Sequence, residues 1–382
     1  MTIAAAVAAA PGTTEVREFA APDVPRDGGL LRIEAAGVCG SDVPAYRRIR
    51  EPTILGHENV GRIEALGDAA RERWGFDAGD RVLIEEYLPC GHCAWCRSDD
   101  FRLCDATDIW MGGIRYGTTP VSVAPALWGG FSRFQYLHPR SVLHRVPDDM
   151  PAELAALAIP LSNGLQWVLR EARAAYGNTV VIQGPGQQGL ACVVAAKLAG
   201  AARIVISGLA SDTRRLEVAR MLGADDTIVI DAAHGTKTSA TDTNGDNTRV
   251  NGDALTSHVR EITGGRMADL VIEASSGGPD TVSDAIRLAR KRGTVVLCGE
   301  KHRPVPEFDA DAVVSRVLRI IGVRGHGYES VENALALIAS GKFPLDAMCT
   351  DSFGLNDVDR AIRRLAGESG SDAIHVTVLP WS

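Results

Sequence analysis

The sequence predicts an α/β protein of two domains: an irregular β domain and a doubly wound parallel sheet. At 382 residues the chain is too long for one ordinary domain. Short apolar alternations separated by Gly and Pro turns fill about the first 150 residues, which is typical of β structure. From Pro151 onward, segments typical of strands alternate with segments typical of helices, and this alternation indicates a parallel sheet.

The elements follow from local patterns. Residues 1–10 are apolar but carry no Lys or Arg, so they lack the basic start of a secretory signal and are expected to form a strand. Apolar alternations at 30–35 and 81–84 predict further strands of the first domain. In the second domain, helices are expected at 152–158, 166–175, 190–199, 214–222 and 281–290, and strands at 179–183, 203–207, 226–230, 270–274 and 294–298.

The first domain is expected to use both ends of the chain. A predicted helix at 331–340 and a predicted strand at 373–379 return to it, so it comprises 1–157 and 322–382. The second domain comprises 158–321. Within it, residues 232–254 are rich in Gly, Thr, Asn, Asp and Ser and offer almost nothing to bury, which predicts a flexible surface insertion.

Charge and composition exclude several classes of partner. The net charge of −8 leaves no basic surface of the kind that nucleic acid or an anionic membrane attracts. No run of about 18 apolar residues occurs, so no membrane span is expected. Four of the eight cysteines crowd into residues 90–104, which favours a metal site in a cytoplasmic protein over a disulfide framework.

The crowded cysteines have the spacing of a zinc-binding loop. Cys90, Cys93, Cys96 and Cys104 form a C-x2-C-x2-C-x7-C array within a lobe at about 88–106. Four thiolates can close a tetrahedron around zinc and leave no open position, so this zinc would be structural. An iron–sulfur cluster also takes four cysteines, but nothing else in the sequence points to electron transfer.

A second group of metal ligands comes from two separate loops. Cys39 and His57 are suitable ligands for a catalytic zinc, which usually takes three protein groups and keeps one position open. Glu58 either ligates the metal directly or supports a ligand by a hydrogen bond without touching the metal. Ser41 lies two residues after Cys39 and is suited to relay a proton from an alcohol.

A glycine motif predicts a dinucleotide site. The expected strand 179–183 is followed by Gly184-Pro185-Gly186-Gln187-Gln188-Gly189 and then by an expected helix. In that context G-x-G-x-x-G is the Rossmann fingerprint. Gly184 permits the tight turn, Gly186 lets the pyrophosphate approach the backbone, and Gly189 allows the helix to pack on the strand.

The choice between NAD and NADP stays open. NAD enzymes usually place an acidic residue at the end of the next strand, where this chain has Gly208. Asp212 follows four residues later, and we favour NAD because a longer loop brings that carboxylate within reach. Arg214 and Arg215 come next and are the alternative partners of a 2′-phosphate.

These motifs, in this order, resemble the zinc-containing alcohol dehydrogenases of the medium-chain dehydrogenase/reductase superfamily, over essentially the whole chain. The positions that carry the resemblance are Gly56-His57-Glu58, Gly61, Gly67 and Ala70, Gly37 to Asp42, Gly79 to Val82, the four-cysteine lobe and the glycine motif. The resemblance implies a GroES-like catalytic domain, a Rossmann domain, a structural zinc, a catalytic zinc, NAD or NADP, and a homodimer or homotetramer. It also places Asn163 near the nicotinamide and the backbone around Cys298 near its carboxamide.

Two positions depart from the family pattern. Members acting on alcohols and polyols have a third zinc ligand where this chain has Ile159, and many have a relay His where it has Pro44. Either Cys39, His57 and Glu58 hold the catalytic zinc, or it binds weakly or is absent. The leading hypothesis is a zinc-dependent alcohol or polyol dehydrogenase acting on a small alcohol or carbonyl compound. The alternatives are an NADPH-dependent enone or quinone reductase and a nucleotide-binding protein without catalysis.

Overall fold

The computed structural model describes residues 2–230, 253–301, 303–305, 308–368, 370 and 372–382. The insertion predicted at 232–254 falls, up to residue 252, outside these described residues. The chain divides into two compact units, one formed by Met1–Ser162 with His326–Ser382 and the other by Asn163–Gly325. In the described ranges, no helix is both long and apolar enough to cross a membrane.

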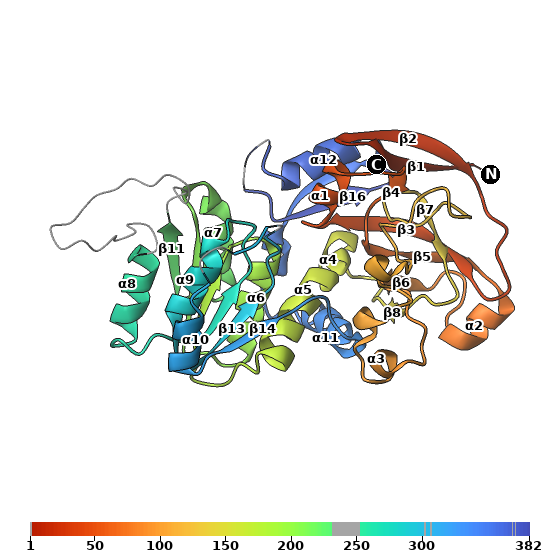
Figure 1. Ribbon diagram of the computed structural model, residues 1–382. Coiled ribbons are helices and arrows are strands. Elements are labelled where there is room, and N and C mark those ends of the chain that lie inside the picture. Colours follow the sequence, from red (N-terminus) through yellow and green to blue (C-terminus); the bar gives the residue numbers. More distant parts are fainter. Residues whose placement is uncertain (1, 231–252, 302, 306–307, 369, 371) are drawn as a thin grey trace. The chain divides into compact units, whose positions relative to one another are not determined.

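The second unit is built on a parallel sheet of six strands, with the order β11-β10-β9-β12-β13-β14. Its strands are β9 (Thr179–Gln183), β10 (Arg203–Leu209), β11 (Asp226–Ile230), β12 (Ala268–Glu273), β13 (Ala289–Leu297) and β14 (Arg319–Gly322). Its helices are α6 (Gln187–Leu198), α7 (Thr213–Leu222), α8 (Asp253–Ile262), α9 (Asp280–Leu288) and α10 (Ala310–Arg316). The strand order reverses between β9 and β12, which is the Rossmann arrangement and confirms the predicted doubly wound sheet (Figure 1).

Apolar runs explain why these strands form, since strands covered on both faces need apolar side chains throughout. Val181, Val205, Val271 and Val295, from four neighbouring strands, are fully buried in one core cluster. Because such runs are bounded by turn residues, β9 and β11 begin and end where the sequence predicts.

Two predicted helices extend too far at their C-terminal ends. The helix expected at 166–175 is a π-helical turn, Gln166–Glu171, that ends before Arg173, whose φ of +56° is not helical. The helix expected at 281–290 ends at Leu288, because Ala289 pairs with Ala268 and starts β13. The helical propensity of a sequence does not show where its backbone pairs with a neighbouring strand instead.

The first unit is a β structure that joins both ends of the chain. Its larger sheet has the order β15-β16-β3-β5-β6-β8, with β7 paired to β3, and its smaller sheet has the order β2-β1-β4. The strands are β1 (Thr2–Ala10), β2 (Thr13–Ala20), β3 (Gly29–Val38), β4 (Thr53–Ile54), β5 (Glu58–Leu66), β6 (Arg81–Ile84), β7 (Phe134–Leu137), β8 (Leu143–Arg145), β15 (Cys349–Gly354) and β16 (His375–Leu379). Residues 376–378 of β16 pair antiparallel with residues 36–38 of β3.

Short helices complete this unit, and both chain ends lie in it (Figure 1). They are α1 (Asp42–Arg47), α2 (Asp68–Trp74), α3 (Ala94–Arg97), α4 (Ala152–Ala156), α11 (Tyr328–Ala339) and α12 (Val358–Leu365). Helix α5 (Ala158–Leu165) contains the boundary between the two units. Apolar residues of β1, β3, β5 and β16, together with α12, share one core cluster.

A buried cluster of charges joins three elements of the first unit. Glu85, directly after β6, is fully buried and lies 3.3 Å from His144 Nε2 of β8 and 2.8 Å from His326 Nε2. Burial opposes ionisation of Glu85, but the charge of His326 and the hydrogen bonds with both rings outweigh it and lower its pKa to about 2. His144 Nδ1 lies 2.6 Å from Glu332 of α11. Although burial favours the neutral ring, Glu332 and Glu85 raise the pKa of His144.

Candidate metal centres and dinucleotide site

The four clustered cysteines converge in the folded lobe. Their Sγ atoms all lie within 4.8 Å of one another, with 3.5 Å between Cys93 and Cys96 and 3.9 Å between Cys90 and Cys96. None of the eight cysteines forms a disulfide. A zinc ion with Zn–S bonds of about 2.3 Å needs neighbouring sulfurs about 3.8 Å apart. The lobe therefore fits a single tetrahedral ion, whereas a cluster of several irons would hold the thiolates farther apart.

Backbone amides support negative charge on these sulfurs. The N–H of Cys93 donates to Cys90 Sγ at 3.4 Å, and the N–H of Cys90 donates to Cys104 Sγ at 3.3 Å. Amide donation lowers the pKa of Cys90 to about 6. The lobe is tied to α11, because Asp99 accepts a hydrogen bond from the N–H of Tyr328 at 2.8 Å.

Strand register brings the second ligand group together. Cys39 follows the end of β3, His57 precedes the start of β5, and Gly37 pairs directly with Glu58 in the antiparallel ladder of these two strands. Ligand atoms of Cys39, His57 and Glu58 lie within 4.8 Å of one another. His57 and Glu58 are buried, with 7% and 1% of their surfaces exposed.

The donor set of this group fits zinc. Thiolate, imidazole and carboxylate are all zinc ligands, and one such atom from each of the three residues converges in this group. Ile159 is buried and offers no ligand atom, so the group has three candidates rather than four. Burial and the charge of Glu58 raise the pKa of Cys39, while contact with His57 opposes that shift.

Two residues of the loop after Cys39 contact the ligands. Asp42 is 1% exposed; its Oδ2 accepts the N–H of Cys39 at 2.9 Å, and its Oδ1 lies 3.4 Å from His57 Nδ1. Burial favours the neutral ring, but the charges of Asp42 and Glu86 raise the pKa of His57 well above its ordinary value. Ser41 is exposed, and its Oγ lies 3.4 Å from His57 Nε2.

Glycine at position 37 makes room for the Glu58 carboxylate. A Cβ added to Gly37 would overlap Glu58 Oε2 and lie 2.7 Å from the ring of His375. That ring is fully buried, with Nδ1 3.8 Å from Glu58 Oε2. Burial lowers the pKa of His375 to about 4.

Gly37→Ala is therefore expected to displace the Glu58 carboxylate and weaken metal binding at Cys39 and His57. Losing such support typically costs about 10- to 100-fold in metal affinity or activity, and we expect kcat/KM to fall by that factor. Zinc per chain after dialysis and steady-state kinetics measure the effect. The control is Gly322→Ala, where an added Cβ meets open space. A Gly37→Ala protein with wild-type zinc content and activity would rule out this role.

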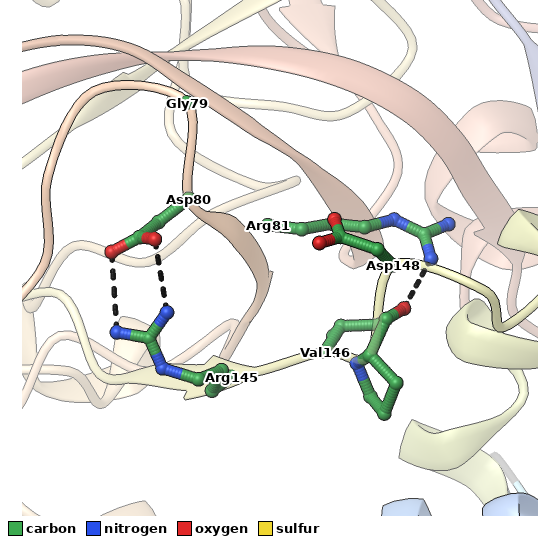
Figure 2. Close-up of a pocket in the computed structure, with 7 residues that line it drawn as sticks. Gly79, Asp80, Arg81, Arg145, Val146 and Asp148 are labelled. Atoms are coloured by element: carbon green, nitrogen blue, oxygen red, sulfur yellow. Dashed lines mark hydrogen bonds and ion pairs between the residues drawn. The ribbon is translucent and has the colours of Figure 1, made fainter.

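The pocket in Figure 2 is not this site. It has a volume of about 420 Å³ and is lined by residues 79–81 and 145–148, which include none of the predicted site residues. Arg145 forms an ion pair with Asp80 there at 2.9 Å, and Arg81 donates to the carbonyl of Pro147 at 2.7 Å. These contacts hold the start of β6 against the end of β8, which indicates a structural role for the residues that line this pocket.

The glycine motif has the geometry that a dinucleotide site requires. Gly184 follows β9 with a φ of +98°, and an added Cβ would lie 2.8 Å from the Cα of Ser275. An added Cβ at Gly189 would collide with the carbonyl of Gly184, so α6 could not pack this closely with any other residue. Gly186 caps α6, and open space lies where its side chain would be. That space at a helix N-terminus fits a pyrophosphate.

The carboxylate of Asp212, which the sequence places near the ribose, already has partners within its own segment. An added Cβ at Gly208 would lie 2.7 Å from Pro185, so this position packs against the glycine turn. Asp212 is 5% exposed; its carboxylate accepts the N–H of Leu209 at 2.8 Å and pairs with Arg215 at 3.0 Å. Asp212 therefore closes the turn that follows β10.

The remaining predicted cofactor residues lie in the same unit. Gln187 and Gln188 form the first turn of α6, and Asn163 lies on α5. Cys298 follows β13, and its N–H donates to the carbonyl of Glu273 at 3.0 Å. The glycine motif and Cys298 follow the carboxyl ends of β9 and β13, and Gly208 lies in the last residues of β10. The carboxyl ends of strands in one parallel sheet meet at one edge.

Several polar residues at these sites were not predicted from the sequence. Asp42 ends the Gly37–Asp42 segment of the family pattern, so its acidic side chain was the available signal. A buried ion pair, Lys301 Nζ to Glu273 Oε1 at 2.7 Å, joins the last residue of β12 to the segment after β13. Glu86 and Arg115 lie beside the Cys39 group. No local pattern marks these last pairs, because their members are far apart in the chain.

Comparison with known proteins gives consistent results over the whole chain. The family model described as alcohol dehydrogenase GroES-like domain matches residues 26–148, and that described as zinc-binding dehydrogenase matches 189–340. A probable alcohol dehydrogenase of Mycobacterium tuberculosis is 34% identical over 385 residues, covering 99% of this chain and 98% of that protein. Erythritol/L-threitol dehydrogenase of Mycolicibacterium smegmatis is 29% identical over 396 residues, covering 98% and 97%. The crystal structure of an alcohol dehydrogenase of Thermotoga maritima superposes with a TM-score of 0.82 at 25% identity, covering 100% of both chains.

Proposed function

Because this chain belongs to the zinc-containing alcohol dehydrogenases of the medium-chain dehydrogenase/reductase superfamily, we propose that it interconverts an alcohol or polyol and the corresponding carbonyl compound. The chain is an oxidoreductase acting on CH–OH groups, with zinc and NAD or NADP as cofactors. The observation that carries the proposal is the convergence of Cys39, His57 and Glu58 in one buried group.

Cys39, His57 and Glu58 would hold the catalytic zinc, and the four lobe cysteines would hold a structural zinc. When bound, the catalytic zinc polarises the substrate oxygen and lowers the pKa of the alcohol, while the nicotinamide takes up the hydride. Asp42 fixes the backbone of Cys39 and faces the ring of His57, so it holds two ligands in register. Ser41 connects His57 to solvent through an exposed hydroxyl and is placed to pass on the proton that the alcohol loses.

The second unit would hold the dinucleotide. Gly184, Gly186 and Gly189 leave the N-terminus of α6 open to a pyrophosphate, with Gln187 and Gln188 in its first turn. By the family pattern, Asn163 and the backbone at Cys298 serve the nicotinamide end. The buried Lys301–Glu273 pair stiffens the sheet edge next to Gly184, because Ser275 contacts both the pair and that glycine.

We infer a preference for NADP over the NAD that the sequence favours. Gly208 presents no carboxylate, and Asp212 is held by Leu209 and Arg215. Arg214 lies exposed on the first turn of α7, where positive charge favours a 2′-phosphate.

Arg214→Ala is expected to lower kcat/KM for NADP⁺ by about 10-fold, as for the loss of one hydrogen bond between charged groups. The value for NAD⁺ should change less than about threefold, since that cofactor lacks the phosphate. Arg220→Ala, in the last turn of α7, is the matched control. Equal losses with both cofactors, or a wild-type preference for NAD⁺, would contradict the inference.

Zinc content and substrate turnover test the function together. About two zinc ions per chain, with NAD(P)-dependent oxidation of alcohols or polyols, is the expected result. About one zinc per chain, with no alcohol oxidation but reduction of enones or quinones, would overturn it.

We further propose that the protein is a cytoplasmic homodimer or homotetramer. Its eight free thiols suit a reducing compartment. Light scattering measures the number of chains in the assembly.

A further inference from the structure

Two charged side chains that are not candidate ligands lie beside the Cys39 group. Glu86 comes two residues after β6, and Arg115 belongs to the loop after the short turn Ile109–Met111. Main-chain contacts join the two segments. The N–H of Tyr116 donates to the carbonyl of Glu86 at 2.9 Å, and Tyr87 forms an isolated antiparallel β-bridge with Arg115. The pair is therefore fixed by main-chain contacts rather than carried on free loops.

This pair is close enough to influence the metal ligands. Gly117 follows Arg115 by two residues, and a Cβ added there would lie 3.1 Å from His57 Nδ1. Burial opposes ionisation of Arg115, but the charge of Glu86 is the largest of the influences that raise its pKa. Burial likewise opposes ionisation of Glu86, and Arg115 and His57 lower its pKa. Both side chains are therefore charged, and the segment that carries Arg115 lies against His57.

The pair has unused hydrogen-bonding capacity. Arg115 Nη1 lies 3.6 Å from Glu86 Oε2, which is an ion pair beyond hydrogen-bond distance. Arg115 Nε is buried and has no hydrogen-bond partner among the described residues. Side-chain exposures of 15% and 18% leave both groups partly accessible. A desolvated guanidinium is costly unless its donors are satisfied, so a polar ligand would gain from binding here.

We propose that Glu86 and Arg115 recognise a second hydroxyl group of the substrate, which makes polyhydric alcohols the preferred class; this inference rests on the proposed function. A hydroxyl group both donates and accepts, so it can accept from the guanidinium and donate to the carboxylate. An anionic substrate fits less well, because Glu86 already neutralises Arg115 and Glu58 and Asp42 add negative charge nearby. A simple alcohol would leave Arg115 Nε without a hydrogen-bond partner among the described residues.

The test compares three substrates that share a secondary alcohol on three carbons: propan-2-ol, propane-1,2-diol and lactate. With the zinc-loaded full chain, kcat/KM for the diol should exceed that for propan-2-ol by about 30-fold or more, since sites built for a hydroxyl strongly reject analogues that lack it. Arg115→Met should lower the ratio of kcat/KM for the diol to kcat/KM for propan-2-ol by about 10-fold or more, mainly through KM for the diol. Glu86→Gln should give a smaller loss in the same direction.

Controls separate recognition from folding. Arg145→Met removes an arginine that pairs with Asp80 in the pocket of Figure 2 and should leave the diol preference unchanged. Arg115→Lys keeps the charge but loses the planar fork, and it should retain part of the preference if Arg115→Met fails to fold. Zinc content and thermal unfolding are measured for every variant.

The outcomes distinguish the two proposals. Equal losses for diol and propan-2-ol would overturn recognition by Arg115 and leave it a positioning residue. A wild-type preference for lactate would overturn it in favour of anion binding. Equal turnover of diol and propan-2-ol, unchanged in the variants, would refute the inference while the proposed function stands. Turnover of no alcohol at all would refute the proposed function and the inference with it.

Discussion

Cys39→Ser is expected to lower kcat by about 1,000-fold or more while the protein stays folded. The substitution replaces a candidate zinc thiolate with a hydroxyl that ligates poorly at neutral pH. A 1,000-fold loss corresponds to about 4 kcal/mol of activation free energy, the scale expected when polarisation of the substrate oxygen is lost. Stability should change little, because the backbone N–H of Cys39 still reaches Asp42 and the side chain keeps its size.

Kinetics and elemental analysis check this result together. We expect zinc to fall from about two ions per chain to about one, since the four-cysteine lobe is untouched. Cys349→Ser, which alters a cysteine of β15 outside both metal groups, is the control and should keep both ions and full activity. Unchanged kcat and zinc in Cys39→Ser would remove Cys39 from the catalytic centre.

Glu85→Gln is expected to destabilise the first unit by about 3 kcal/mol near pH 6. The carboxylate lies between two buried histidines, and removing one partner of a buried charge pair leaves the other charge uncompensated. The pKa of Glu85 is lowered from 4.5 to about 2, so its ionised form contributes stability above pH 4.5, which is lost as the pH falls toward 2. A difference of this size corresponds to about 3 kcal/mol.

His144 sets the opposite limit. Its pKa is raised above 6.5, so its protonated form contributes stability below pH 6.5, and that contribution is lost as the pH rises through the raised value. The cluster should therefore stabilise the unit most between about pH 4.5 and 6.5. Hydrogen exchange of the amides of β6 and β8 in the full chain measures this locally. Glu332→Gln changes a partner that is 46% exposed and should cost much less; equal effects would contradict the explanation.

Local signals predicted much of the fold. Apolar runs bounded by turn residues located β9 and β11 correctly, and the glycine spacing marked the turn before α6. The error at 166–175 has a physical reason: the backbone of Arg173 leaves the helical region at a position where the side-chain pattern continues. Periodicity reports side-chain environment and says little about backbone strain.

The candidate sites were predictable only where the residue type carries the chemistry. The spacing of the four crowded cysteines is enough to predict a metal site. A Cys and a His that are distant in sequence predict one only through the resemblance to a family. Asp42, Glu86 and Arg115 depend on which segments pair in space, such as the backbone of Glu86 with that of Tyr116. Long-range pairing of this kind leaves no periodic trace in one sequence.

The pairing of β16 with β3 has a consequence for the newly made chain. The second unit is continuous in sequence and is complete before the ribosome reaches β16, so it can fold early. Residues 36–38 lead directly into Cys39. Ala36 and Gly37 can pair early with β5, but all three residues lack their partners on the other side until residues 376–378 are synthesised. Trp381 then donates to the carbonyl of Ile33 at 2.8 Å and closes the same strand from the other end of the chain. An unfinished polypeptide can thus carry a folded cofactor-binding unit while the strand that leads into Cys39 still lacks β16, so catalytic competence arrives only after residues 376–378 have been synthesised.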